Sequence, residues 1–312
     1  MPITTPASPK ILCIGSSVLD YVFQLDELPR HAEKYRAKGL EFVGGGTAAN
    51  AAVAIARLGG QAYLASRIGK DVAGRTLMQD LHKEGVNTRY VKRFENVNTS
   101  ISSVYIDDQG ERQIVSFPDP NMPHDPTWLP SRWPSGMNAV LGDTRWDAGS
   151  AHMFSLARKA GKIAVLDGDR APHNVRALEL ATHIAFSVQG LREITGEYDP
   201  AKGLQAYAQR VASKHNAVNP TWLAVTMGEG GVLYLEGDDM HHVPAYRIKA
   251  VDTLGAGDVW HGAFVLALAE GKATRDAVAY ASAVAAIKCQ RIGGRRGTPN
   301  RDQVYAFMVK NR

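Results

Sequence analysis

Cysteine is scarce in this chain of 312 residues, where only Cys13 and Cys289 occur and neither has metal-ligand spacing. The sequence therefore excludes a disulfide framework and a cysteine-rich zinc site, and we expect buried free thiols in a reducing compartment. Long apolar runs are also lacking, since the longest, residues 264–269 and 281–287, are too short to span a bilayer. Residues 1–10 carry three prolines and no apolar core, so we expect no signal peptide, no membrane partner and a cytoplasmic location.

Dense charge of one sign is missing as well. The net charge is +5, and no run of Lys and Arg interleaved with aromatic residues is present. This pattern argues against a nucleic-acid partner and favours small anionic molecules. With 45% hydrophobic residues over this length, the chain can bury one substantial core, and we expect a single domain over residues 10–312.

Short apolar runs alternate with helical patterns along most of the chain. This alternation predicts an α/β fold with a mostly parallel sheet, helices on both faces and ligands at the carboxyl ends of the strands. The expected strands are residues 11–14, 62–65, 139–141, 163–166, 184–186 and 222–225, and the expected helices are residues 48–58, 73–81, 259–269, 276–288 and 301–308.

Period-two patterns in residues 18–42 and 99–117 interrupt this alternation. They predict a small antiparallel sheet that projects from the main body. Such a sheet would either act as a lid that keeps water from a phosphoryl-transfer site or consist of plain edge hairpins.

Residues 252–258 place small residues and a carboxylate at the start of the apolar helix expected at residues 259–269. Three main-chain N–H groups would lie at the positive end of that helix, where they suit a phosphoryl group in flight. They belong to Gly255, Ala256 and Gly257. Asp258, in the first turn, would reach a substrate hydroxyl as a general base. The alternative is that Asp252 and Thr253 simply cap the helix.

A second glycine run precedes the Ala-rich helix expected at residues 48–58. It consists of Gly44, Gly45 and Gly46. Such a run would bring the backbone close to a bound polar molecule, with Asn50 offering one donor and one acceptor, or it would only solve a packing problem. Asp20, just after the first strand, would accept hydrogen bonds from two sugar hydroxyls, or it would form a turn.

Two further strand ends carry polar groups. Thr226, Gly228 and Gly231 follow the strand expected at residues 222–225, so either a nucleotide lies there or a tight hairpin turns there. Asp167 and Asp169 end another strand, where they would serve a magnesium ion and phosphates or form a solvated turn. Arg145 also follows a strand, which would point a cation toward the ligand crevice.

Taken in order, the glycine run ending in Asn50, the Thr-x-Gly-x-x-Gly pattern and residues 252–258 resemble the motifs of the PfkB, or ribokinase-like, family of sugar kinases. The resemblance covers nearly all of the chain after residue 10. It implies a three-layer α/β/α domain with a small antiparallel β-sheet lid, ATP with Mg²⁺ as phosphoryl donor, and a sugar hydroxyl as acceptor. It also implies an anion hole at Gly255, Ala256 and Gly257, the base Asp258, sugar contacts from Asp20, Gly45, Gly46 and Asn50, and nucleotide contacts from Thr226, Gly228, Gly231, Thr253, Gly255 and Gly257.

A narrower similarity is to the bacterial 6-deoxy-6-sulfofructose kinases of sulfoquinovose breakdown. The matching segments are residues 44–49, 85–90, 143–146, 165–169 and 293–295. This similarity implies that Lys34 and Arg145 bind a sulfonate, with Ser116 standing where those enzymes have a helping Asn.

The chain departs from the broader family at its Asn-x-x-Glu motif, which organises magnesium and phosphates. Ser187 and Gly190 occupy the two motif positions. Magnesium would then be held through water by Asp167, Asp169 or Glu193. The sulfofructose kinases share the same loss, so it favours the narrower similarity.

The sequence thus predicts ATP-dependent phosphorylation of 6-deoxy-6-sulfofructose at O1, giving the 1-phosphate. One alternative is a kinase for another ketose, such as fructose 6-phosphate or tagatose 6-phosphate, because phosphate and sulfonate both present three tetrahedral oxygens. An alternative of another class is a sugar- or nucleotide-sensing protein that kept the fold and lost the chemistry. An exposed lid edge also suggests a homodimer joined through the lid.

Overall fold

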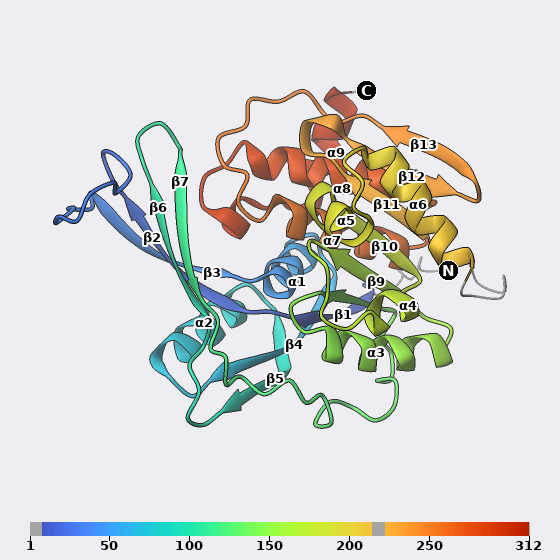
Figure 1. Cartoon of the computed structure of the whole chain (residues 1–312), viewed down its shortest axis with the longest axis horizontal. Coiled ribbons are helices and arrows are strands. Elements are labelled where there is room, and N and C mark those ends of the chain that lie inside the picture. Colours follow the sequence, from blue (N-terminus) through green and yellow to red (C-terminus); the bar gives the residue numbers. More distant parts are fainter. Residues whose placement is uncertain (1–7, 214–221, 312) are drawn as a thin grey trace, which may run out of the picture.

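The central sheet of the computed structural model, which describes residues 8–213 and 222–311, contains nine strands (Figure 1). Their order in space is β13-β12-β11-β10-β9-β8-β1-β4-β5. All neighbours are parallel except the hairpin pairs β11–β12 and β12–β13. The bounds are β1 Lys10–Gly15, β4 Gln61–Gly69, β5 Asn87–Phe94, β8 Ala139–Asp143, β9 Ile163–Gly168, β10 His183–Ser187, β11 Trp222–Thr226, β12 Val232–Glu236 and β13 Asp239–Val243.

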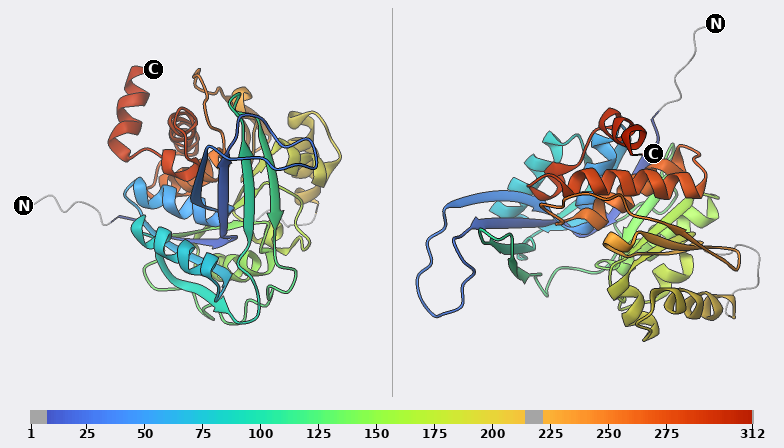
Figure 2. Two further views of the ribbon diagram at one scale, coloured as in Figure 1. Left: turned by 90° about the vertical axis from the view of Figure 1, so that its left-hand side faces the viewer. Right: turned by 90° about the horizontal axis from the view of Figure 1, so that it is seen from above.

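Helices cover both faces of this sheet, because alternate strand residues point to opposite sides. In β1, Ile11 and Cys13 belong to one apolar core, whereas Leu12 and Ile14 belong to the other. The first core packs against α1 Thr47–Arg57, α2 Val72–Lys83, α7 Ala256–Ala269, α8 Thr274–Cys289 and α9 Arg301–Lys310. The second packs against α3 Asp147–Lys159, α4 Arg176–Leu180, α5 Val188–Thr195 and α6 Pro200–Ala212. Figure 2 shows the two helical layers on opposite sides of the sheet.

A second, four-stranded sheet projects from the body, at the left of Figure 1. Its order is β3-β2-β6-β7, with β2 Val18–Gln24, β3 Gly39–Gly45, β6 Ile101–Ile106 and β7 Arg112–Phe117. We call this sheet the lid sheet. Two of its three pairings are antiparallel, but β2 and β6 are parallel, since each enters the lid from the carboxyl end of a parallel strand.

The α/β architecture with a small second sheet is therefore confirmed, and every strand and helix predicted from the sequence is present. The strand β5 and the helices α3 to α6 were not predicted, and the hairpin after β11 was offered only as an alternative to a nucleotide site. Both cysteines are free, with Cys13 buried and Cys289 half-buried. Among the helices in the described part of the chain, none has the length and apolar character needed to cross a bilayer.

Candidate active site

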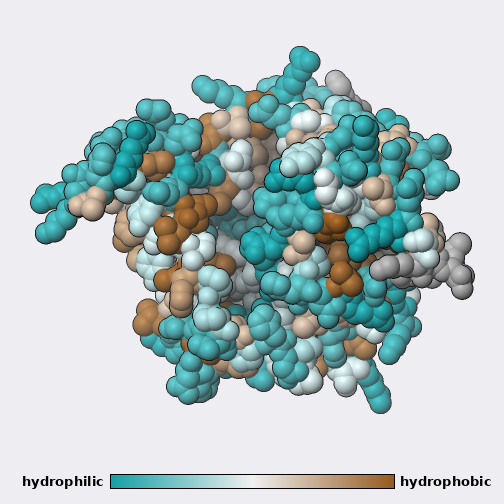
Figure 3. Space-filling view, in the orientation of Figure 1, coloured by the Kyte–Doolittle hydropathy of each residue, from teal (hydrophilic) through white to brown (hydrophobic). Residues whose placement is uncertain are grey.

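A cavity of about 610 Å³ lies between the lid sheet and the carboxyl ends of the parallel strands. The space-filling view shows the hollow between the lid and the main body (Figure 3). After β1 the chain forms β4 on one side of it and later β8 on the other, so the strand order switches direction there. Such a switch point leaves a crevice where α/β proteins bind ligands.

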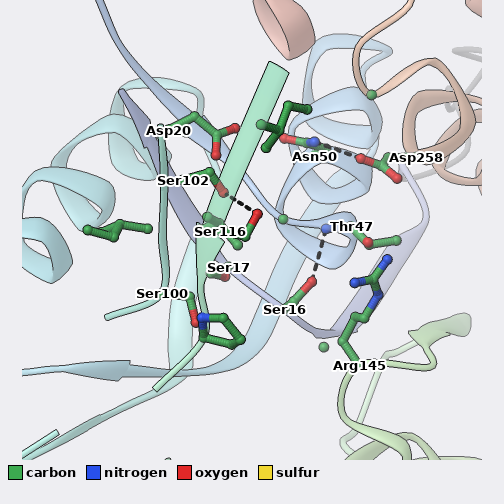
Figure 4. Close-up of a pocket in the computed structure, with 18 of the residues that line it drawn as sticks. Ser16, Ser17, Asp20, Thr47, Asn50, Ser100, Ser102, Ser116, Arg145 and Asp258 are labelled. Atoms are coloured by element: carbon green, nitrogen blue, oxygen red, sulfur yellow. Dashed lines mark hydrogen bonds between the residues drawn. The ribbon is translucent and has the colours of Figure 1, made fainter. Parts of the chain in front are cut away.

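Asp143 fixes the backbone at this switch point. Its Oδ2 accepts a hydrogen bond from the N–H of Ser16 at 2.7 Å, and its Oδ1 accepts one from the N–H of Arg145 at 3.0 Å. Ser16 Oγ in turn accepts the N–H of Thr47, the first residue of α1, at 3.1 Å (Figure 4). Burial raises the pKa of the Asp143 carboxyl, and the Ser16 N–H counteracts that rise. The ends of β1 and β8 and the start of α1 are thereby held together.

Asp258 and Asn50 meet at the top of the cavity (Figure 4). Asn50 Nδ2 donates to Asp258 Oδ2 at 2.7 Å, joining α1 to the first turn of α7. Burial raises the pKa of Asp258 to about 6, and the Asn50 hydrogen bond opposes the rise. A carboxylate with this pKa is a stronger base than an ordinary Asp while remaining ionised at neutral pH.

The N-terminus of α7 opens onto the same cavity. Gly255 precedes the helix with φ 72°, and no side chain caps it, so the simple capping alternative does not describe this terminus. The Ala256 N–H is directed to the Thr253 carbonyl at 3.1 Å. Helix geometry leaves the next two N–H groups, those of Gly257 and Asp258, without intrahelical partners. A Cβ on Gly257 would meet nothing within 4 Å, so space for an anion lies beside it.

Arg295 belongs to the segment 293–295 of the narrower similarity but was given no role from the sequence, and in the structure it contacts Asn50. It belongs to the 3-10 helix η2, Gly294–Gly297, and its side chain is 1% exposed. Its Nη1 donates to Asn50 Oδ1 at 3.5 Å, and its Nη2 donates to Asp80 Oδ2 at 2.5 Å. The guanidinium passes so close to Gly44 that a Cβ there would lie 1.7 Å from Nη2. The glycine run therefore solves a packing problem in addition to lining the cavity.

Asp20 lies across the cavity, on the lid sheet (Figure 4). A Cβ on Gly45 would lie 2.2 Å from its Oδ2, so only glycine fits beside this carboxylate. Burial raises the pKa of Asp20 to about 6, while a Ser102 hydrogen bond and the charge of Arg295 lower it. Ser102 and Ser116, on neighbouring lid strands, have hydroxyls 3.2 Å apart. These groups give the lid side hydroxyl and carboxylate oxygens suited to a polyhydroxylated ligand.

Arg145 lines the cavity, where its guanidinium pairs with Asp169 through two hydrogen bonds. A second guanidinium, Arg67 at the end of β4, was missed by the sequence analysis. Its Nη1 donates to the Pro123 carbonyl at 3.0 Å and its Nη2 to the Arg145 carbonyl at 3.5 Å, and it stacks over Trp146. Burial lowers the pKa of Arg67 to about 10. In the described part of the chain its hydrogen bonds go to carbonyls and not to a carboxylate, although the charges of Asp143 and Asp147 act on it.

Lys34 does not line the cavity. It is exposed in the loop between β2 and β3, which projects from the far edge of the lid in Figure 1. Its role in anion binding remains a prediction. Among the other predicted substrate residues, Asp20, Gly46, Asn50, Ser116 and Arg145 line the cavity, and so do the unpredicted Ser17, Ser100 and His124.

The three carboxylates predicted to hold magnesium are not brought together. Asp167 is buried, with Oδ2 3.2 Å from His261 Nδ1, whereas Asp169 pairs with Arg145 in the cavity. Glu193 accepts the Ala171 N–H at 2.9 Å and a Gln189 hydrogen bond. In the described residues, no three His, Cys, Asp or Glu side chains are grouped to hold a metal. The three residues do not form a direct-ligand cluster, and magnesium binding through water by Asp167, Asp169 or Glu193 remains a prediction.

The two positions of the missing Asn-x-x-Glu motif have another role here. Ser187 Oγ caps α5 by accepting the Gly190 N–H at 2.9 Å and donates to the Asp169 carbonyl at 3.1 Å. A Cβ on Gly190 would lie 2.0 Å from the Gly168 carbonyl oxygen. This backbone therefore has no room for a Glu side chain at position 190.

The predicted nucleotide residues after β11 form a tight turn. Gly228 and Gly231 have φ values of 56° and 81°, where Gly228 begins the 3-10 turn Gly228–Gly230 and Gly231 follows it, leading into β12. The Thr226 hydroxyl donates to the Phe186 carbonyl at 3.2 Å. A tight hairpin therefore forms after β11, as one of the two alternatives from the sequence stated. Nucleotide binding at this turn remains a prediction.

A buried carboxylate lies beside an open helix N-terminus and faces a cavity with several hydroxyls, an arrangement that suits the transfer of an anionic group to an alcohol. Comparison with known proteins agrees. Residues 8–301 match the model of the pfkB family of carbohydrate kinases. The chain is 27% identical to a ribokinase from Lactococcus lactis over 95% of this chain and 96% of that protein, and 30% identical to a Klebsiella pneumoniae fructokinase over 73% and 76%.

A solved structure from Agrobacterium tumefaciens, provisionally assigned as a ribokinase, superimposes with a TM-score of 0.89. It is 35% identical to this chain and covers 97% of it, with 98% of its own length matched. The chain belongs to the pfkB family and is a carbohydrate kinase. The family predicted from the sequence is confirmed.

Proposed function

We propose that this kinase transfers the γ-phosphoryl group of ATP to O1 of 6-deoxy-6-sulfofructose. The observation that carries the proposal is the Asn50–Asp258 pair beside the open terminus of α7, in one cavity with Arg145. The names of the related ribokinases and fructokinase support a sugar as acceptor. We expect ATP to bind as its magnesium complex. We also expect the protein to act in the cytoplasm.

In this mechanism Asp258 takes the proton of the acceptor hydroxyl. Asn50 holds the carboxylate through Oδ2, which leaves Oδ1 available to the substrate. Alignment of the hydroxyl with the phosphorus supplies much of the acceleration in phosphoryl transfer. The Gly257 and Asp258 N–H groups lie where negative charge on the transferred group would be stabilised.

The charge at the other end of the cavity favours one negative group on the sugar. Arg67 and Arg145 carry two positive charges there, and Asp169 offsets one of them. The charges of Asp143 and Asp147 also act on Arg67, so this end of the cavity is only weakly positive, which suits a sulfonate monoanion better than a phosphate dianion. Ser116 lies in the cavity and offers a hydroxyl in place of an amide.

Steady-state kinetics with 6-deoxy-6-sulfofructose, fructose 6-phosphate and fructose test this proposal. Arg145→Ala should lower kcat/KM for the sulfonated ketose about ten- to a hundredfold, as expected for one charge-assisted hydrogen bond. The same change should leave fructose nearly unaffected, because fructose lacks the anion. Equal losses of kcat/KM on both sugars in Arg145→Ala would mean that the sulfonate binds elsewhere. If the wild-type protein turned over none of the sugars, a sensing protein would be favoured.

A ketose phosphate is the second candidate, because the guanidinium groups of Arg67 and Arg145 both line the cavity and would also suit a dianion. It would be favoured if wild-type kcat/KM were higher for fructose 6-phosphate than for the sulfonated ketose. Arg67→Met is the variant to compare with Arg145→Ala. It removes the positive charge of Arg67 and keeps an apolar side chain over Trp146.

A further inference from the structure

Asp252 begins the turn ahead of α7, and its carboxylate is the anchor of that turn. Oδ1 accepts the Leu254 N–H at 2.8 Å, and Oδ2 accepts the N–H groups of Gly293 and Gly294 at 3.0 and 2.9 Å. Although burial opposes ionisation, the Gly294 and Leu254 N–H groups hold the pKa of Asp252 below its usual value. A full negative charge therefore lies three residues before Gly255.

That charge is unfavourable for a phosphate-binding turn. A helix N-terminus offers the equivalent of about half a positive charge. An ionised carboxylate in the preceding turn would more than cancel it unless cations stand nearby.

Two cations from distant parts of the chain meet this carboxylate. Lys288, on α8, has a fully buried side chain, and its Nζ donates to the Asp252 carbonyl at 2.8 Å and lies 3.4 Å from Oδ1. Arg112, on lid strand β7, donates from Nη2 to Oδ1 at 2.9 Å. Burial lowers the pKa of Lys288, and the neighbouring Asp252 counteracts that effect.

We propose that Lys288 and Arg112 are positioning residues of the phosphate site, which hold Asp252 in place and offset its charge so that the α7 terminus can accept a triphosphate. The cluster of two cations and one carboxylate carries one net positive charge. Because Arg112 belongs to the lid sheet, the sheet that walls the sugar cavity also contributes a charge to the phosphate site.

The inference rests on ATP being the phosphoryl donor. Its test is the binding of two nucleotides, ADP and the nonhydrolysable triphosphate adenosine 5′-(β,γ-imido)triphosphate, by isothermal titration calorimetry. Only the second has the terminal phosphoryl group that would face the turn. Lys288→Met and Arg112→Met should each weaken the triphosphate about tenfold or more, the worth of one charged partner, and leave the KM of the sugar nearly unchanged.

A purely structural role predicts a different result, namely equal losses for ADP and the triphosphate. Equal losses, or unchanged triphosphate binding in folded variants, would overturn the inference. Should Lys288→Met fail to fold because it empties a buried site, Arg112→Met decides the question, since Arg112 is partly exposed on an edge strand. The matched controls are Lys272→Met and Lys38→Met. The first removes a cation beside Glu270, and the second removes a lid cation that pairs with Asp108.

The wild-type protein separates this inference from the proposed function. If it binds neither nucleotide, the kinase proposal fails and the inference fails with it. If it binds and turns over ATP while the variants lose both nucleotides equally, only the inference fails.

Discussion

Asn50 and Asp258 lie 208 residues apart in the chain, yet the amide of one donates to the carboxylate of the other at 2.7 Å. Their contact requires α1 and α7 to pack side by side, and Gly262 makes this possible because a Cβ there would lie 2.6 Å from the Ala51 carbonyl oxygen. The proposed base Asp258 and its hydrogen-bond donor Asn50 are thus positioned by helix packing.

Asp258→Asn should lower kcat by about 10² or more, because general-base catalysis is worth about 10² to 10⁴ in rate. Binding of ATP should change little. Tm should not fall, since the change removes a buried carboxylate whose pKa is raised. Turnover at the wild-type rate would remove Asp258 from the role of base.

The pH dependence of kcat/KM, which reports the free enzyme, should show an acid limb near pH 6. The pKa of Asp258 is raised to about 6, so the carboxylate is protonated and inactive below that pH and active above it. Asn50→Ala removes a hydrogen bond that lowers this pKa, so the limb should move to higher pH. The pKa of Asp20 is also about 6, so the two carboxylates must be distinguished. The acid limb would belong to Asp20 if it were unchanged in Asn50→Ala and lost in Asp20→Asn.

Two glycines of α7 should respond to alanine in opposite ways. At Gly257 a methyl group meets no protein atom, so Gly257→Ala should leave the free energy of unfolding unchanged or raise it by about 0.5 to 1 kcal/mol, while kcat falls because the methyl group occupies the anion's space. At Gly262 the methyl group meets the backbone of α1, so Gly262→Ala should lower the free energy of unfolding by about 1 to 3 kcal/mol. Urea unfolding and kcat measured together check both expectations.

The lid sheet should join two copies of the chain. Its edge strands β3 and β7 expose Leu40, Phe42, Ile114, Val115 and Phe117, which are 47% to 61% exposed, and Figure 3 shows apolar side chains on the lid. Exposed apolar edge strands favour pairing. Phe42→Asp should shift the mass measured by light scattering from dimer to monomer, whereas Val309→Asp on α9 should not. A wild-type monomer would contradict this prediction.

The sequence predicted the residues whose role depends on local structure. The turn before α7 and the strands with alternating burial follow from short-range patterns, so Asp258 and the α/β fold could be predicted. Arg67 and Arg295 could not, because nothing local distinguishes them from exposed cations; they contact the cavity only after distant strands and η2 assemble. Lys34 was predicted from resemblance alone, and the structure places it outside the cavity.

By itself, the sequence determined the layered fold through its periodicity and the turn before α7 through small residues at a helix start, and its resemblance to known motifs indicated the family. Only the tertiary structure decided which charges meet. It paired Arg145 with Asp169, set Lys288 and Arg112 against Asp252, and left no room for a side chain at Gly190. The physical reason is that the energy of a charge depends on its distance from other charges and on burial, and both are fixed only when segments far apart in the chain pack together.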